Sequence, residues 1–344
     1  MINIKKTNNS ISRTKKKFRK TDKNRLLLVA AFCLFAILQS GLRDLNNLPA
    51  GNDTSNYLYK YIEVSRIPLS TLVKNFSFYS TDYGERDLGF PIFMKLTQVI
   101  YEDFTFYMFL TAILFMVPFG MLIYKYVKSY LGIILSFLIY FALYTNIVNS
   151  FMRQAVSLGV ILFGIRYIIN SDWKKYFSLL AIAFIIHASA ILAFPLYFLP
   201  KWGSTRKWIF LALAVSPFLM LYTSQIISYL VVGTVYERYA VDESLNPINF
   251  ISYLLLSAAL TFYFYKDIKD VPDSKLLISG VLGSTLLIPI VWIGGTAIRL
   301  SFYYSVFIIP MIAVILDYAK IGKSERKAAY ILGIAFFIFF IFRH

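Results

Sequence analysis

Long apolar runs, each bounded by charged residues or proline, recur along the whole chain. A helix needs roughly 17–25 such residues to cross about 30 Å of hydrocarbon. The runs do not alternate polar and apolar residues, which excludes a closed barrel, the other structure that spans lipid. The pattern predicts an all-α, polytopic membrane protein with about 9–10 transmembrane helices. We place spans at 26–42, 104–124, 130–149, 151–170, 208–231, 248–265, 276–293 and 299–318, with a short final segment at 328–342.

Two apolar segments fit this scheme poorly. Residues 88–101 are short and contain a lysine, and residues 176–199 contain His187 and Pro195. If 176–199 were an ordinary span, ten later basic residues would lie outside the cell. If the segment enters the membrane and returns, those ten lie inside and at most three cations lie outside. Because cytoplasmic loops carry an excess of lysine and arginine, we expect a re-entrant hairpin over 176–199 with His187 near its tip. Residues 43–103 then form one long extracytoplasmic loop.

Charge is scarce and concentrated at one end. Only 15% of the residues are charged, against about a quarter in soluble domains. The formal net charge is +17, and residues 1–25 contain ten basic side chains and one acid. Because an apolar span follows directly, without a small-x-small cleavage site, we interpret 1–25 as a disordered cytoplasmic arm attracted to anionic lipid and not as a nucleic-acid-binding tail. Residues 26–344 form a single multi-span membrane domain.

Few residues are of the kinds that hold metals or build soluble active sites. The one cysteine, Cys33, lies in the first span, which excludes a disulfide and a cysteine-based zinc site. There is no phosphate-binding glycine loop, no Gly-x-Ser-x-Gly elbow and no His-Glu-x-x-His. Glu85 and Asp87 have a separation suited to a divalent cation, but such pairs are common by chance. We predict neither a metal nor a cofactor.

Three arginines lie at helix ends that this topology places on the outer face: Arg43, Arg153 and Arg299. One arginine there is explained by snorkelling to the headgroups. The positive-inside bias disfavours several, and a charge inside the membrane costs about 2.5–3.5 kcal/mol on insertion scales. Guanidinium groups form bidentate hydrogen bonds with phosphates, so we interpret the three as ligands of a polyprenyl diphosphate. Other polar residues on the same side are Asp53, Tyr57, Glu85 and Gln154.

His187 has two interpretations that stay open. A lone histidine in an apolar segment is more often a hydrogen-bonded packing residue than a catalyst. Its place beside a helix break, before Ala188-Ser189-Ala190, favours a functional role.

Taken in order, these residues resemble the EpsG family of membrane proteins, relatives of the Wzy polysaccharide polymerases. The matching pieces are Arg43 followed by Gly51-Asn52-Asp53 and Tyr57; Glu85 with Gly89-Phe90; Met152-Arg153-Gln154; His187-Ala188-Ser189-Ala190; and Arg299 with Tyr303-Tyr304 and Pro310. Two features depart from the family pattern. Thr54 stands where the family has tyrosine after the aspartate, and the basic amino-terminal arm is peculiar to this chain.

The resemblance implies polymerisation of oligosaccharide repeats carried on undecaprenyl diphosphate, yielding exopolysaccharide, capsule or O-antigen at the outer face of the bacterial cytoplasmic membrane. Such a membrane glycosyltransferase needs cations for the diphosphate leaving group and a base for the acceptor hydroxyl. We assign Arg153 and Arg299 to the diphosphate, with Arg43 as a third contributor. The base is Asp53, Glu85 or His187, in that order of preference. The predicted substrate site also contains Gln154, Tyr57 and Tyr303.

The expected partners are the lipid-linked oligosaccharide, membrane lipid, and a flippase and a chain-length regulator of the same pathway, with no nucleic acid. Two alternatives stay open. An O-antigen-ligase-like or acyl-transferring enzyme would use the same arginines to cap or modify glycans. A transporter or flippase for a lipid-linked precursor predicts charges through the depth of the membrane, whereas acids are nearly absent from these spans.

Overall fold

The fold comes from a computed structural model, which describes residues 2–46, 53–74, 87, 89–231, 247–294 and 297–343. In this part of the chain every regular element is a helix, which confirms the all-α prediction. The longer helices are α1 (Ile2–Gly41), α5 (Phe104–Tyr126), α6 (Tyr130–Leu143), α8 (Met152–Ile169), α9 (Trp173–Ile186), α11 (Arg206–Val231), α12 (Ile248–Tyr263), α14 (Ser274–Leu286) and α18 (Lys323–Arg343). The shorter elements are α2 (Thr54–Ser65), α3 (Leu69–Lys74), α4 (Gly89–Ile100), α7 (Asn146–Asn149), the 3-10 helix η1 (Ala188–Tyr197), α10 (Leu199–Trp202), α13 (Tyr265–Ile268), α15 (Ile288–Val291), α16 (Ile298–Ser305) and α17 (Ile308–Tyr318).

Three described helices are long and apolar enough to cross a membrane: the Asp22–Gly41 part of α1, α5 and α8. A fourth span results if α16 and α17, bent by 43° at their junction, count as one. The helices α6, α12 and α14 are apolar but only 10–17 residues long, because each is interrupted before the end of its apolar run. The structure therefore supports three to four spans by this criterion, and the larger number stays a prediction.

The centre of the bundle is a row of closely packed helices in which α5 lies between α1 and α8, and α8 also packs against α9. Pro118 inside α5 has no N–H to donate to the Leu114 carbonyl. Gly159 of α8 lies against that carbonyl, where an added β-carbon would be 2.2 Å from the oxygen. A small residue is thus required for the two backbones to approach, as is common between helices in membranes.

The segment 176–199 contains a hairpin with His187 at its tip. Helix α9 ends at Ile186, His187 has an extended backbone with φ −153° and ψ 113°, and η1 then runs back along α9. The Tyr197 hydroxyl donates to the Ser171 carbonyl at 2.9 Å, so the end of η1 returns to the start of α9. The break at His187 falls where the sequence predicted it, and the position of the hairpin in the membrane stays a prediction.

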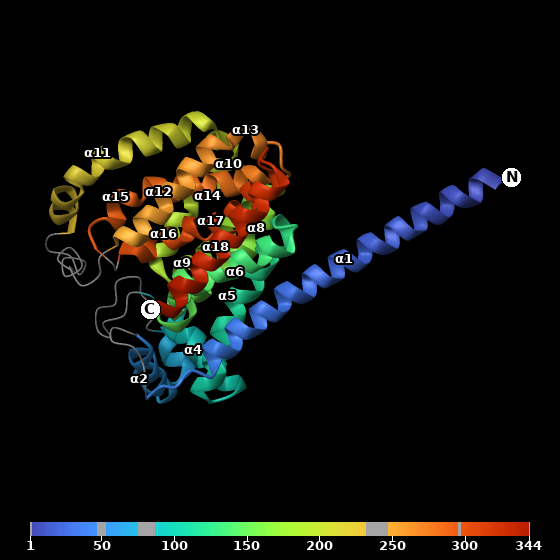
Figure 1. The fold of residues 1–344 in the computed structure, drawn as a ribbon. Coiled ribbons are helices and arrows are strands. Elements are labelled where there is room, and N and C mark those ends of the chain that lie inside the picture. The colour runs from blue at the N-terminus through green and yellow to red at the C-terminus, as the bar shows by residue number, and fades with distance from the viewer. Residues whose placement is uncertain are drawn as a thin grey trace.

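Three cations that the predicted topology puts in the cytoplasm, Arg25, Lys125 and Lys320, lie at one end of the bundle. Lys125 pairs with Asp273 at 2.7 Å and Lys320 with Asp267 at 3.9 Å, which joins the end of α5 and the residues after α17 to the segment between α12 and α14. Arg25 donates to backbone carbonyls at the end of α5. Figure 1 shows α10 and α13 at this end and α2 and α4 at the opposite end.

Helix α1 runs from the α2 end of the bundle and extends far beyond it toward the amino terminus (Figure 1). Its first half covers the basic residues of the predicted arm, and the interpretation of residues 1–25 as a separate cytoplasmic arm stays a prediction. Lysine and arginine are good helix formers, and the apolar part of α1 provides the helical turns onto which they add. The division of the chain at residue 26 stays a prediction.

Candidate functional site

Three of the predicted site residues meet where α16 begins. Arg299 donates from Nη1 to Oδ2 of Asp53 at 3.1 Å, across a sequence separation of 246 residues. The Gln154 side-chain amide donates to the backbone carbonyl of Arg299. The guanidinium also stacks over Phe151, with its carbon 3.8 Å from the ring centre. The Arg299 and Asp53 side chains are 34% and 31% exposed. The ion pair is therefore packed against the protein on one side and accessible on the other.

A second group of residues surrounds Asp87. Its Oδ2 accepts from Nδ1 of His187 at 2.6 Å and from Nη1 of Arg153 at 3.2 Å. Its Oδ1 accepts from the backbone N–H of Ala188 at 2.8 Å. Burial by itself raises the pKa of Asp87, but the hydrogen bond and charge of His187 and the charge of Arg153 lower it more. The pKa of Asp87 therefore lies below its ordinary value, and the carboxylate is ionised at neutral pH.

The hydrogen bond to Asp87 sets the tautomer of neutral His187. An ionised carboxylate only accepts, so Nδ1 of His187 carries the proton and Nε2 carries the lone pair. Among the described residues, Nε2 has no hydrogen-bond partner. The His187 side chain is 24% exposed whereas that of Asp87 is 5% exposed. The imidazole therefore has a buried, oriented side and an accessible, basic side.

A close approach of two helix ends brings Asp87 to His187. Gly89 begins α4 and lies against the end of α9, where a β-carbon would be 2.6 Å from the carbonyl oxygen of Ile185. Phe90 donates its N–H to the Asp87 carbonyl at 2.9 Å, which fixes Asp87 just before the helix. Only glycine lets α4 begin this close to the tip of the hairpin.

Arg43 holds the backbone around the site together. It donates to the carbonyl and hydroxyl of Ser40 and, at 3.1 Å, to Oγ1 of Thr54. The Thr54 hydroxyl in turn donates to the Asn149 carbonyl at 2.7 Å. Burial lowers the pKa of Arg43 to about 10, so its guanidinium is charged at neutral pH. Arg43 thus joins the end of α1 to α2 and to the turn before α8.

The two predicted tyrosines lie in the walls of the site. Tyr57 is 8% exposed, with Phe90 edge-on at 5.6 Å and the Arg153 guanidinium 6.0 Å from its ring centre. Tyr303 is fully buried, and its hydroxyl lies 3.1 Å from that of Ser189. The ring of Tyr57 is thus largely covered by its neighbours. Binding of substrate by either tyrosine stays a prediction.

These contacts form one network around the start of α8. The Ser150 hydroxyl accepts from the Asp53 N–H at 3.1 Å, and Arg153 and Gln154 connect to Asp87 and Arg299. The structure thus brings together Asp53, His187, Arg43, Arg153, Gln154, Arg299, Tyr57 and Tyr303, and the predicted base Glu85 lies outside the described residues. In the described part of the chain no three His, Cys, Asp or Glu side chains are grouped to hold a metal ion.

Sequence reasoning gave Asp87 too little weight. From the sequence, Asp87 was considered only as one of a carboxylate pair with Glu85. In the structure, the Asp87 side chain contacts His187 and Arg153. The available signal was its place two residues before Gly89, next to a motif that had already been noted.

Long apolar helices with a network of arginine, aspartate and histidine side chains at one end define an integral membrane protein with a polar site at the end of its helical bundle. The model of the EpsG family matches residues 26–344, nearly the whole chain. The protein therefore belongs to the EpsG family, a family of Wzy-like polymerases, and this confirms the resemblance noted in the sequence. No curated protein and no solved structure matches the chain.

Proposed function

We propose that the protein polymerises oligosaccharide repeats carried on a polyprenyl diphosphate. The anomeric carbon of the growing chain forms a bond to a hydroxyl oxygen of the incoming lipid-linked repeat. Its bond to the carrier diphosphate breaks, the leaving diphosphate keeps the electron pair, and the acceptor proton passes to a base. Family membership supports polymerase activity, and the network around α8 supports this substrate and chemistry.

One observation carries the proposal: Arg299 and Arg153 belong to the same network, and both side chains are partly exposed. Arg153 is 38% and Arg299 is 34% exposed. In the described part of the chain Arg299 uses only Nη1 on a carboxylate, which leaves further N–H groups for phosphate oxygens. Preorganised guanidinium groups stabilise the charge that develops on a diphosphate as it leaves.

His187 is the base in this proposal, which changes the order of preference that the sequence suggested. A carboxylate that orients one imidazole nitrogen and leaves the other open is a common arrangement for general-base catalysis. Asp87 supplies that carboxylate at 2.6 Å. Asp53, the first choice from the sequence, is paired with Arg299, and we assign it to holding that guanidinium.

An apolar cavity beside the network supports a lipid-linked substrate. It has a volume of about 580 Å³ and lies between η1, the end of α14 and Tyr304. The preceding residue, Tyr303, contacts Ser189, two residues after His187. We place the first isoprene units of the carrier in this cavity, below the diphosphate. Its lining residues are Ile191, Leu192, Phe194, Pro195, Leu199, Gly283, Leu286, Leu287 and Tyr304.

We place the network on the extracytoplasmic side of the membrane. The grouping of Arg25, Lys125 and Lys320 at the opposite end supports this orientation, because cytoplasmic ends carry the excess of basic residues. The amino terminus is then cytoplasmic, residues 43–103 are an outer loop, and the hairpin of α9 and η1 is re-entrant. The sugars reach the network from the outer face.

The experiment that tests this function is polymerisation by purified protein in proteoliposomes supplied with a lipid-linked repeat. We expect Arg299→Ala and His187→Ala each to slow polymer formation by about 100-fold or more, the usual effect of losing a charge-stabilising donor or a general base. Lys174→Ala is the matched control, because it removes a cation from α9 outside the network. Wild-type chain lengths and rates in both site variants would overturn the assignment. Repeats transferred once to a different acceptor, without chain growth, would support a ligase instead.

A further inference from the structure

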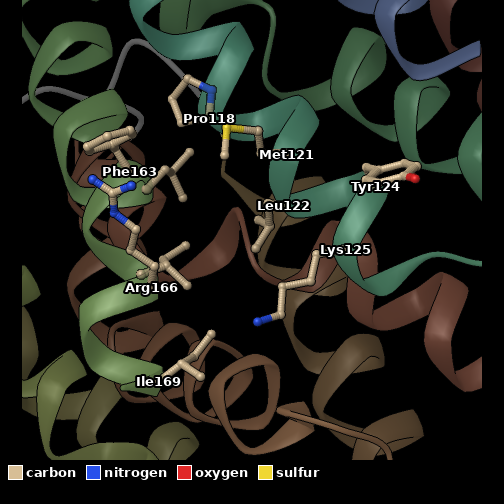
Figure 2. Close-up of a pocket in the computed structure, with 10 residues that line it drawn as sticks. Pro118, Met121, Leu122, Tyr124, Lys125, Phe163, Arg166 and Ile169 are labelled. Atoms are coloured by element: carbon tan, nitrogen blue, oxygen red, sulfur yellow. The ribbon is translucent and has the colours of Figure 1, made fainter. Parts of the chain in front are cut away.

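A second cavity lies between α5 and α8, on the far side of the bundle from the network. Its volume is about 300 Å³, and it is open to the surface. Pro118, Met121 and Leu122 line it from α5, and Phe163 lines it from α8 (Figure 2). The two helices touch closely at Gly159, and the cavity lies beyond that contact, toward their carboxyl ends. Both helices are long and apolar enough to cross a membrane.

Two basic side chains line this apolar cavity, one from each helix. Lys125 extends from α5, and Arg166 lies on the opposite wall on α8 (Figure 2). Arg166 stacks on Phe163, with its guanidinium carbon 4.0 Å from the ring centre, and donates to the Tyr167 hydroxyl at 2.8 Å. In the part of the chain that the structure describes, no carboxylate is within ion-pair distance of Arg166. Lys125 is already paired with Asp273, so the free positive charge is that of Arg166.

We propose that this cavity binds one anionic phospholipid from the surrounding leaflet. The phosphate lies between Arg166 and Lys125, and an acyl chain fills the apolar space lined by Met121 and Leu122. Basic residues in the last turn of a helix also complement the helix dipole, which explains each cation separately. The dipole does not account for an apolar cavity between the two. A basic, apolar pocket between spans suits an anionic lipid, whose headgroup and tail need both features.

The test uses purified full-length protein in detergent, titrated with phosphatidylglycerol or phosphatidylcholine and measured by native mass spectrometry. We expect one phosphatidylglycerol to bind more tightly than phosphatidylcholine. Arg166→Gln should weaken that binding about fivefold, the effect of losing one basic contact near a membrane surface. Lys174→Gln is the control, because Lys174 is a cation that does not line the cavity.

Met121→Trp gives a second test that does not change the charge. Met121 is 56% exposed, so a larger side chain is tolerated on the lipid side while it fills the cavity. We expect weaker phosphatidylglycerol binding with an unchanged melting temperature. Equal affinity of the wild type for the two lipids would overturn the inference, as would wild-type affinity in both Arg166→Gln and Met121→Trp. The assay needs no polymerase activity, so its outcome is independent of the proposed reaction.

Discussion

Gly89→Ala perturbs the site without touching any of its charged groups. The added β-carbon would lie 2.6 Å from the Ile185 carbonyl oxygen and the same distance from the Ile185 side chain, where ordinary contacts begin at 3.4 Å. Because the obstacle includes backbone, the start of α4 must move away by roughly 1 Å. That movement carries Asp87 away from Nδ1 of His187, where the present distance is 2.6 Å.

A Gly→Ala substitution inside a helix normally raises stability, whereas we expect Gly89→Ala to lower it. Alanine normally stabilises a helix interior by about 1 kcal/mol relative to glycine. Here we expect a loss of about 1–3 kcal/mol from overpacking, seen as a lower melting temperature. A shift of about 1 Å at a catalytic base typically costs about 100-fold in rate, so polymer formation should fall by that factor.

The assay compares polymerisation rate and melting temperature for Gly89→Ala and for a matched control, Gly164→Ala. Gly164 is inside α8, and its added β-carbon would meet Leu179 and Tyr176 at an ordinary 3.4 Å. We expect the control to retain activity. A Gly89→Ala protein that is as active as the wild type and at least as stable would refute the argument that this glycine positions Asp87.

Two further predictions concern the ionisation of Asp87 and the orientation of the chain. Because the pKa of Asp87 is lower when folded than when unfolded, its contribution to stability is present above the unfolded pKa of about 4 and is lost as the pH falls through the folded pKa. Asp87→Asn should therefore lower stability at pH 7 by about 1–3 kcal/mol and flatten the decline of melting temperature in acid; an unchanged acid profile would contradict this. In a Cys33→Ser background, Tyr59→Cys, on the exposed face of α2, should react with a membrane-impermeant thiol reagent in intact cells. Lys207→Cys should react only after permeabilisation, and labelling of both positions under the same condition would refute the orientation.

The sequence predicted best those helices whose apolar runs are uninterrupted. The predicted span 104–124 is α5, Phe104–Tyr126, and 151–170 is α8, Met152–Ile169. The predicted span 276–293 is divided near Pro289 into α14 and α15, because proline begins a new helix. Hydropathy averages over such a break, so the sequence alone does not show where an apolar run is divided.

Within the site, the sequence identified individual side chains but not their pairing. Arg153, Arg299 and His187 stood out because a charge or a lone histidine next to an apolar run is costly. Their partners come from segments about 70 to 250 residues away, and no local pattern carries that information. The role of Gly89 was equally hidden, since it depends on a carbonyl of another helix.

The most direct test of the account is the affinity of the purified protein for a polyprenyl diphosphate, measured against the matching monophosphate. If Arg153 and Arg299 bind the carrier, the diphosphate should bind at least tenfold more tightly, by about 1.4 kcal/mol. Replacement of both arginines by glutamine should abolish the difference, whereas Lys174→Gln should leave it intact. Equal affinity for the two lipids, or a diphosphate preference that survives the loss of both arginines, would contradict the central claim.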